Sequence, residues 1–207
     1  ELLLVDDHAV VREGYRRLLE RRPDLHVAAE ASDAEEALQF LRNTPIDLIV
    51  LDLSLPGMGG IELTRRILQR FPEAKILAFS MHRDPLFASQ ALRAGALGYV
   101  TKSSTPETLI QAIYKVARNE KVLSPDIAPE MAISLLEGDS NPASDLSPRE
   151  FEVLRLLLGG QAVEEIAGIL NISPKTVQNT HYQIKAKLGV RSDFELARLA
   201  MKLKLID

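Results

Sequence analysis

Short apolar runs alternate with amphipathic stretches over roughly the first 118 residues. Five runs are apolar almost throughout, namely Leu2–Val5, Val27–Ala31, Leu48–Leu51, Ile76–Phe79 and Gly98–Val100. Runs of this length without a polar face indicate strands that are buried on both sides, as in a parallel sheet. Between them, apolar residues recur every three or four positions, which predicts amphipathic helices. Five β–α units in succession predict an α/β fold, a doubly wound five-stranded parallel sheet with helices on both faces.

The pattern changes after residue 118. Residues 119–145 contain three prolines and predict a linker with one short helix, Pro129–Leu136. From residue 146 every apolar run has a helical period, and the expected helices are Pro148–Leu158, Val163–Leu170, Pro174–Leu188 and Phe194–Leu203. The sequence therefore predicts an α/β domain over residues 1–118, a linker over 119–145 and an all-α domain over 146–207.

The composition excludes several kinds of site and of protein. The chain of 207 residues has no cysteine, so disulfides and thiolate metal sites are excluded. No apolar stretch approaches the length of a membrane span, and a cytoplasmic protein is expected. The net charge of -4 is unevenly distributed, because residues 119–145 hold one basic residue against six acidic ones, whereas residues 146–207 hold nine against seven. A polyanion would therefore bind to residues 146–207.

Chemically capable side chains follow the predicted strands where each strand ends. Asp6 and Asp7 follow the first strand, Asp52 the third, Ser80 the fourth and Lys102 the fifth. Since ligands of open parallel sheets bind outside the carboxyl ends of the strands, we expect these groups to converge. Three neighbouring carboxylates repel one another unless a cation is bound, and hard oxygen ligands favour Mg²⁺. The set suits phosphoryl transfer to Asp52, with the lysine and the hydroxyl binding phosphoryl oxygens.

A simpler interpretation exists for each residue alone. An aspartate after a strand can cap the next helix, and Lys102 can form an ion pair with any of the acids. The simultaneous placement of all five groups at one edge of the sheet favours a functional site.

Residues 2–118 resemble the receiver domain of bacterial two-component response regulators, through "LLLVDDH", "DLIVLDLSLPGMGG", "ILAFSMH" and "GALGYVTKS". The resemblance implies a flavodoxin-like fold in which Asp52 is the phosphoacceptor and a Mg²⁺ site is formed by Asp6, Asp7, Asp52 and the backbone carbonyl of Ser54. It also implies that Ser80 and Lys102 contact the phosphoryl group, and that Ser80 and Tyr99 act as the switch pair. The histidine after the acid pair, His8, is expected to make a local polar contact.

The last 60 residues carry a helix-turn-helix pattern. Ser147, a proline and Glu150 form a capping-box sequence, and Ser173 followed by Pro174 begins the second helix of the pair. Residues 171–191 contain no acidic residue. This half resembles the LuxR-type helix-turn-helix domain, and the combination matches the NarL/FixJ class of response regulators.

In that resemblance the helix beginning at Pro174 is the recognition helix in the major groove. Its predicted DNA contacts are Lys175, Thr176, Gln178, Asn179, Tyr182, Lys185 and Lys187. Amide side chains can bond adenine in a bidentate way, so Gln178 and Asn179 are the candidates for base contacts. The lysines and Thr176 are expected on phosphates, and the inward positions Val177, Ile184 and Leu188 in the core. Many family members have histidine where this chain has Thr180, and here the histidine is His181.

The expected function is that of a phosphorylation-activated, DNA-binding transcription regulator, not an enzyme apart from self-phosphorylation from small donors and self-dephosphorylation. Its partners are a sensor histidine kinase, double-stranded DNA and a second copy in a homodimer, and no membrane. One alternative is a phosphatase or phosphotransferase of the haloacid dehalogenase type, but such enzymes need an acid two residues after the nucleophile, where this chain has Ser54. The other is a constitutive DNA-binding module with a silent receiver domain, against which the complete set of acids and lysine argues.

Overall fold

The structure is a computed structural model that describes residues 1–136, 142–203 and 205. Part of the predicted linker, residues 137–141, and residues 204, 206 and 207 of the predicted all-α domain lie outside the described residues. The chain divides into two compact units, Glu1–Ala132 (unit 1) and Ile133–Asp207 (unit 2).

Unit 1 contains a parallel sheet in the order β2-β1-β3-β4-β5-β6. Its strands are β1 (Leu2–Val5), β2 (Val27–Ala31), β3 (Leu48–Asp52), β4 (Ile76–Ser80), β5 (Gly98–Thr101) and β6 (Val122–Leu123). The α/β prediction is confirmed, and the sheet has one strand more than the five predicted. The sixth, β6, pairs with β5 in the register Gly98↔Val122. Two residues are too few to form a periodic pattern, so the sequence predicts Val122 and Leu123 as part of the linker.

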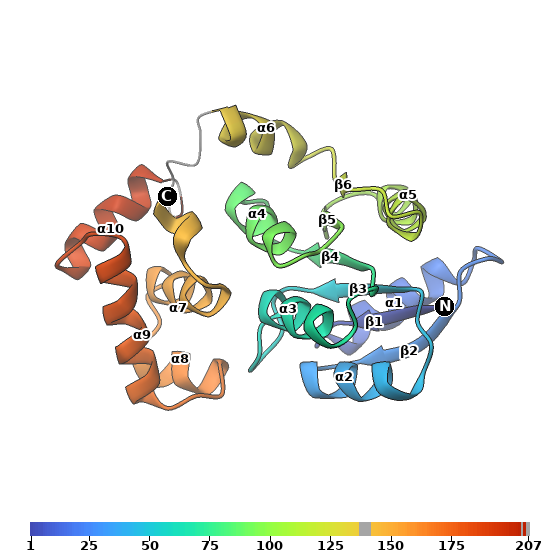
Figure 1. Ribbon diagram of the computed structural model, residues 1–207, viewed down its shortest axis with the longest axis horizontal. Helices are drawn as coiled ribbons and strands as arrows, with labels where there is room; N and C mark the ends of the chain where they lie inside the picture. The colour runs from blue at the N-terminus through green and yellow to red at the C-terminus, as the bar shows by residue number, and fades with distance from the viewer. Residues whose placement is uncertain (137–141, 204, 206–207) are drawn as a thin grey trace. The chain divides into compact units, whose positions relative to one another are not determined.

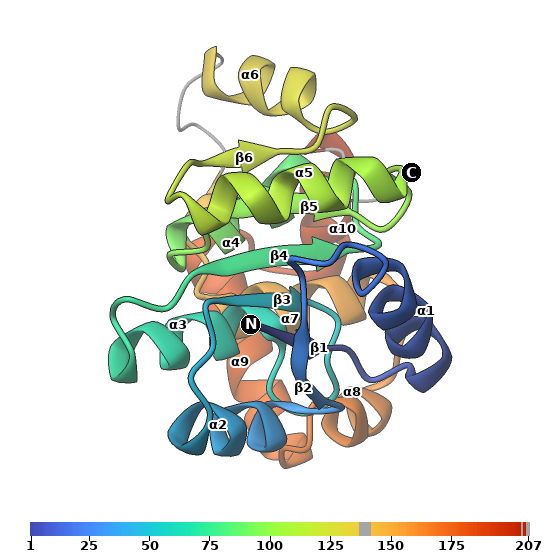
Figure 2. The ribbon, with the colours of Figure 1, turned by 90° about the vertical axis from the view of Figure 1, so that its right-hand side faces the viewer.

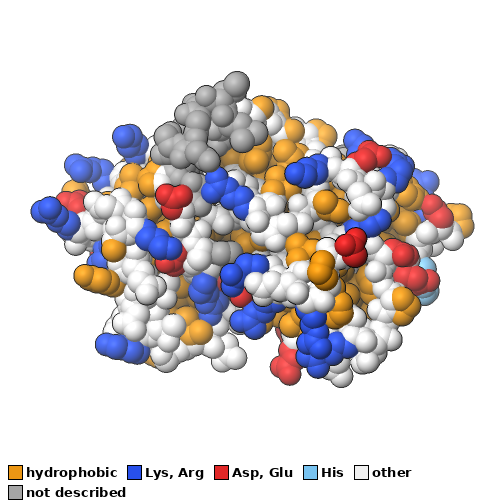
Figure 3. All heavy atoms as spheres, viewed as in Figure 1, with side chains coloured by type: hydrophobic (Ala, Val, Ile, Leu, Met, Phe, Trp, Pro, Cys, Tyr) orange, Lys and Arg blue, Asp and Glu red, His pale blue; other side chains and the backbone are white. Residues whose placement is uncertain are grey.

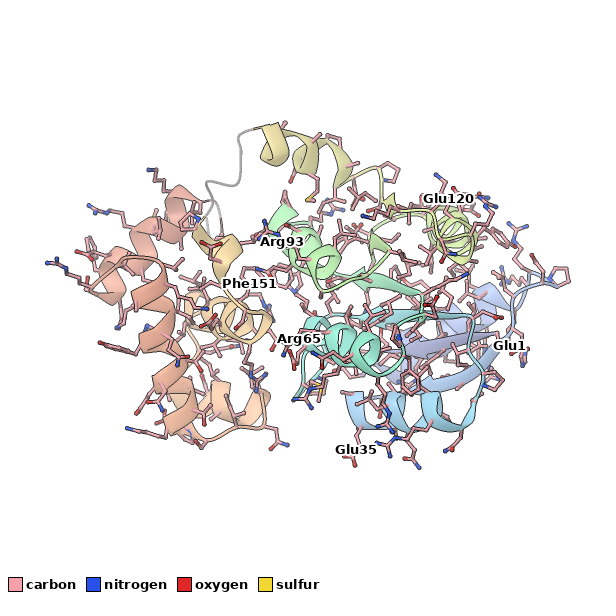
Figure 4. The ribbon with its side chains drawn as sticks, in the orientation of Figure 1. Glu1, Glu35, Arg65, Arg93, Glu120 and Phe151 are labelled. Atoms are coloured by element: carbon pink, nitrogen blue, oxygen red, sulfur yellow. The ribbon has the colours of Figure 1, made fainter. Side chains whose placement is uncertain are left out.

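Five helices accompany this sheet: α1 (Ala9–Leu19), α2 (Ala34–Asn43), α3 (Gly60–Arg70), α4 (Pro85–Arg93) and α5 (Pro106–Ala117). A sixth helix, α6 (Ala128–Leu136), follows β6 and contains the boundary between the two units. Helices α1 and α5 pack on one face of the sheet, and α2, α3 and α4 form the layer on the other (Figures 1 and 2). Asp33 caps α2 by accepting hydrogen bonds from two backbone N–H groups of the first turn. After α5, the turn that contains Glu120, labelled in Figure 4, leads the chain into β6.

The core of unit 1 lies between the strands and these two helical layers. Strands β1, β3, β4 and β5 are buried along their whole length, as two-sided burial in a parallel sheet requires. Each fully buried aliphatic side chain, such as Leu48 or Leu77, contributes about 1.5–3 kcal/mol to folding. This rigid interior fixes where each strand ends, and therefore where the side chains that follow it lie.

The described residues of unit 2 form helices joined by short turns and contain no strand, as predicted. It comprises a 3₁₀ turn, η1 (Pro142–Asp145), and the helices α7 (Pro148–Leu158), α8 (Val163–Ile169), α9 (Pro174–Lys187) and α10 (Asp193–Lys202). Ser147 and Glu150 form the predicted capping box of α7, and the Ser173 side chain caps α9. The core includes Phe151 of α7, labelled in Figure 4, and the inward residues of α9. No helix in the described part of either unit is long and apolar enough to cross a lipid bilayer.

Candidate functional site

The carboxyl edge of the sheet gathers the acids and the lysine that the sequence singled out. Asp52 is the last residue of β3, and Asp6 directly follows β1. The Lys102 ammonium, one residue after β5, lies 2.6 Å from Asp6 Oδ2 and 2.6 Å from Asp52 Oδ2. Residues 96 and 50 positions from Lys102 in the sequence therefore meet at one nitrogen atom.

Backbone groups hold the two buried carboxylates from their other sides. The Ser54 N–H donates to Asp52 Oδ1 at 2.9 Å, and the His8 N–H donates to Asp6 Oδ1 at 2.8 Å. The guanidinium of Arg12 in α1 donates to the backbone carbonyl of Asp6, which fixes the loop after β1. Each carboxylate therefore has a defined orientation before any ligand binds.

Burial and charge oppose each other at this site. Asp52 and Lys102 have side chains that are only 3% and 7% exposed. Burial raises the pKa of the Asp52 carboxyl above its ordinary value, although the nearby Lys102 ammonium acts in the opposite direction. Burial also acts to lower the pKa of Lys102, but Asp52 and Asp6 outweigh it and raise that pKa. Phosphoryl transfer to Asp52 needs the ionised carboxylate, which the Lys102 ammonium favours against burial.

The donor set fits a hard divalent cation. Asp6, Asp7, His8 and Asp52 each offer an atom within 4.8 Å of the others. Asp7 Oδ1 is buried and accepts no hydrogen bond from the described residues, although His8 Nδ1 lies 2.8 Å away as an ion-pair partner. Mg²⁺ prefers carboxylate and carbonyl oxygens, so the three aspartates fit it and the imidazole of His8 does not.

Ser80 and Tyr99 lie beside this cluster but are not in direct contact with its carboxylates. Both are fully buried, at the end of β4 and within β5. The Ser80 hydroxyl accepts from the His82 N–H at 3.2 Å, and the Tyr99 hydroxyl donates to the His82 carbonyl at 2.7 Å. Burial raises the pKa of Tyr99 far above its ordinary value, so its hydroxyl remains a hydrogen-bond donor. The predicted switch pair is thus joined through the backbone of one loop residue.

His82 is a residue that the sequence reasoning missed. Its ring stacks on Phe87 with 4.1 Å between the ring centroids, and its Nε2 lies 3.4 Å from Ser54 Oγ. This places the imidazole beside Ser54, two residues after Asp52. A histidine in a loop gives no periodic signal, so the sequence alone could not distinguish it from a solvated side chain.

The outward face of α9 carries the predicted DNA contacts. Lys175, Thr176, Gln178 and Asn179 are exposed, and Tyr182 is 74% exposed. The inward positions Val177, Ile184 and Leu188 are buried as predicted. Thr180, at the position where the sequence departs from the family, is also buried and donates to the Thr176 carbonyl at 2.9 Å. In the space-filling view, Lys and Arg side chains of unit 2 lie among hydrophobic, acidic and uncharged ones (Figure 3).

Two of the predicted phosphate contacts are already paired within unit 2. Lys187 lies 2.7 Å from Glu150 Oε2, and Lys185 lies 2.9 Å from Asp193 Oδ1. The same Asp193 oxygen lies 3.0 Å from His181 Nε2. Any phosphate contact by these lysines must therefore compete with a carboxylate, whereas Lys175 has no ion-pair partner among the described residues.

Family comparisons agree with this geometry. Residues 2–114 match the response regulator receiver domain, and residues 144–200 match the bacterial regulatory proteins of the luxR family. The response regulator UvrY of Escherichia coli is 37% identical over 203 residues, which cover 97% of this chain and 93% of UvrY. The chain is a two-component response regulator.

Solved structures support the same assignment for this response regulator. A LuxR-family two-component response regulator from Aurantimonas sp. SI85-9A1 is 54% identical with a TM-score of 0.64, covering 65% of this chain and 96% of that one. RcsB from Salmonella enterica serovar Typhimurium, bound to a promoter in the presence of the phosphomimetic BeF3⁻, is 30% identical with a TM-score of 0.72, covering 99% and 98%. The response regulator is thus a DNA-binding transcription regulator of the non-enzymatic type, and its partners are a sensor kinase and DNA.

Proposed function

We propose that a sensor histidine kinase phosphorylates this response regulator on Asp52, and that phosphorylation controls dimerisation and operator binding through α9. One observation carries the proposal: the Lys102 ammonium bridges the buried carboxylates of Asp6 and Asp52 at 2.6 Å each. A bridging ammonium inside a sheet edge costs desolvation that stability alone does not require. The Lys102 ammonium can exchange its contact with a carboxylate for a contact with a phosphoryl oxygen once Asp52 is phosphorylated.

The proposed metal site consists of the side chains of Asp6, Asp7 and Asp52 and the backbone carbonyl of Ser54. Bound Mg²⁺ would neutralise the carboxylates and the phosphoryl oxygens that approach them. Two observations support this assignment: the acids cluster within 4.8 Å, and the buried Asp7 Oδ1 accepts no hydrogen bond from the described residues, although His8 Nδ1 lies 2.8 Å away. Receiver domains generally use such an acidic site for Mg²⁺.

The chain's own groups would divide the chemistry among them. An Asp52 carboxylate oxygen attacks the phosphorus, an O–P bond forms, and the bond from phosphorus to the donor's leaving group breaks. The Ser54 N–H orients the carboxylate, and Lys102 and the Ser80 hydroxyl then bind phosphoryl oxygens. A small donor such as acetyl phosphate can replace the kinase, and water can later hydrolyse the acyl phosphate.

Phosphorylation would act on the loop that joins the switch residues. A phosphoryl group on Asp52 draws the Ser80 hydroxyl toward it, so the His82 N–H loses its acceptor. Because the His82 carbonyl holds the Tyr99 hydroxyl, the loop and the tyrosine would move together. The charge on phosphorylated Asp52 would thus shift the equilibrium between two conformations of this loop and Tyr99, and a shift of this kind can alter a distant part of the protein.

The output is DNA binding by α9, in a homodimer and in the cytoplasm. Gln178 and Asn179 would contact base edges, and Lys175 and Thr176 would contact phosphates, with Tyr182 beside them. Lys185 and Lys187 would contribute only after leaving their carboxylate partners. We assign residues 1–118 to the phosphoacceptor domain, 119–145 to the connecting segment and 146–207 to the DNA-binding domain, with β6 of the connecting segment extending the receiver sheet.

Intact-mass spectrometry after incubation with acetyl phosphate and Mg²⁺ tests the proposal. We expect one phosphoryl adduct, which Asp52→Asn and a chelator should each abolish. Asp47→Asn is the matched control, because Asp47 is an exposed aspartate whose loss should leave the adduct unchanged. An adduct that persists in Asp52→Asn would mean that another residue is the acceptor. Fluorescence anisotropy on a selected operator should show tighter binding by the phosphorylated chain than by Asp52→Asn.

A further inference from the structure

A polar cluster joins the segment after β6 to the loop that carries Lys102. Asp126 lies between β6 and α6, and one of its oxygens, Oδ2, accepts a hydrogen bond from the Thr101 hydroxyl. Its other oxygen accepts from the Ser104 hydroxyl at 3.3 Å, and Ser103 Oγ lies 3.5 Å from Oδ2. Thr101, Ser103 and Ser104 surround Lys102 in the sequence. One carboxylate therefore contacts three of the four residues from Thr101 to Ser104.

A second loop beside the site joins the same cluster. The Arg83 guanidinium, in the loop between β4 and α4, donates to Ser103 Oγ at 3.0 Å and lies 3.9 Å from Asp126 Oδ2. Arg83 is adjacent in the chain to His82, whose backbone binds both switch residues. The cluster thus touches both loops that flank Asp52, one through Lys102 and the other through the switch pair.

Part of the cluster is buried in the core of unit 1. Thr101 and Ser124 are both 0% exposed, and the Thr101 N–H donates to Ser124 Oγ at 3.3 Å. Ser124 in turn accepts, through its carbonyl, the N–H groups of Ile127 and Ala128 at the start of α6. Partial burial acts to raise the pKa of Asp126, but hydrogen bonds from Ser124 and Thr101 outweigh it and lower that pKa, so the side chain is an anion at neutral pH.

The position of Asp126 in the chain gives these contacts a direction. The chain after Asp126 continues through α6 to unit 2 and its DNA-binding helix. The residues that bind Asp126 lie in the loop that carries Lys102 and in the loop that follows Ser80. Because Asp126 is hydrogen-bonded to the hydroxyls of Thr101 and Ser104, a movement of the Lys102 loop must either carry the segment before α6 with it or break these bonds. Either result changes the position or the hydrogen bonding of the segment between β6 and α6.

We propose that Asp126 is a positioning residue that clasps the connecting segment to the two loops of the phosphorylation site and so transmits the state of Asp52 to the DNA-binding domain. This inference rests on the proposed function. It assigns the transmission to the Asp126–Thr101 contact, which no periodic or motif signal in the sequence marks.

The test measures coupling in the full-length chain. An operator is selected from random-sequence DNA with the phosphorylated wild type, and its Kd is measured by anisotropy with and without acetyl phosphate and Mg²⁺. Allosteric coupling ratios are typically about 5–150. We expect Asp126→Ala to bring the ratio of the two Kd values close to one while the phosphoryl adduct still forms. Thr101→Val, which keeps the shape of the buried side chain, should lower the ratio in the same way. The double variant should lose no more than either single one.

Glu130→Ala is the matched control, because it removes the same charge from the exposed surface of α6 and should leave the ratio unchanged. A variant that retains the wild-type ratio, even with a lower melting temperature, would show that Asp126 serves only stability and would overturn the inference. Loss of the adduct itself in Asp126→Ala would place Asp126 in the phosphorylation chemistry and would also overturn it. A wild type whose Kd does not respond to phosphorylation would instead refute the proposed function.

Discussion

Replacing Lys102 by methionine would leave two buried carboxylates without their shared counter-ion. The side chains of Lys102, Asp6 and Asp52 are 7%, 9% and 3% exposed, so water screens their interaction little. Removing one partner of a buried ion pair costs about 3–5 kcal/mol, because the remaining charge stays desolvated. Methionine keeps most of the apolar volume, so packing contributes little to the change. We therefore expect the free energy of unfolding to fall by about 3–5 kcal/mol at pH 7 without Mg²⁺.

Urea unfolding monitored by circular dichroism measures this cost. Lys121→Met, an exposed lysine with no ion pair among the described residues, should change stability by less than about 0.5 kcal/mol. In the Asp52→Asn background the cost of Lys102→Met should be clearly smaller, since one of the two carboxylates is gone. Because burial raises the pKa of Asp52 and the lysine opposes this, the cost should also shrink as the pH falls and the carboxyl is protonated. A loss below about 1 kcal/mol, or one that Asp52→Asn leaves unchanged, would refute the argument.

Three further outcomes follow from contacts in unit 2. Glu150→Gln should lower stability by about 1–2 kcal/mol at pH 7 in urea unfolding, and by progressively less as the pH falls. Burial acts to raise the pKa of this carboxyl, but its lysine partner in α9 and the capping serine lower it, so the stabilisation is lost as the carboxylate is protonated. Asp193→Asn should tighten DNA binding and steepen its salt dependence by about one unit of slope through the released Lys185, and Lys185→Ala should cancel this gain in anisotropy titrations. Gln178→Ala should reduce discrimination at one base pair by about 1–3 kcal/mol, whereas Lys175→Ala should weaken all sequences alike; equal weakening of every sequence by both would mean that Gln178 contacts no base.

The sequence revealed those parts of the molecule that repeat or that stand at fixed places relative to a strand. Five strands, and the acids that follow two of them, could be found because two-sided burial imposes long apolar runs and because parallel strands end at a common edge. Strand β6 could not be found from the sequence, because its two residues form no recognisable pattern. The pairing of Lys187 with Glu150, 37 residues away, was also hidden. Contacts between single side chains distant in sequence depend on the folded backbone, and no local rule specifies them.

Strand β6 has a consequence for how the receiver can be cut from the chain. At Val122 and Leu123 it covers the outer edge of β5, which would otherwise present free N–H and C=O groups. An uncovered edge is a template on which a second molecule can add a strand, and very short edge strands are one way in which natural sheets protect themselves. A fragment that stops at residue 118, the boundary suggested by periodicity alone, would uncover β5 at Gly98 and Tyr99 and open it to such pairing. A fragment that continues through Ser124, which also bonds Tyr99 and Thr101, would keep its own edge strand and stay monomeric at concentrations where the shorter one self-associates.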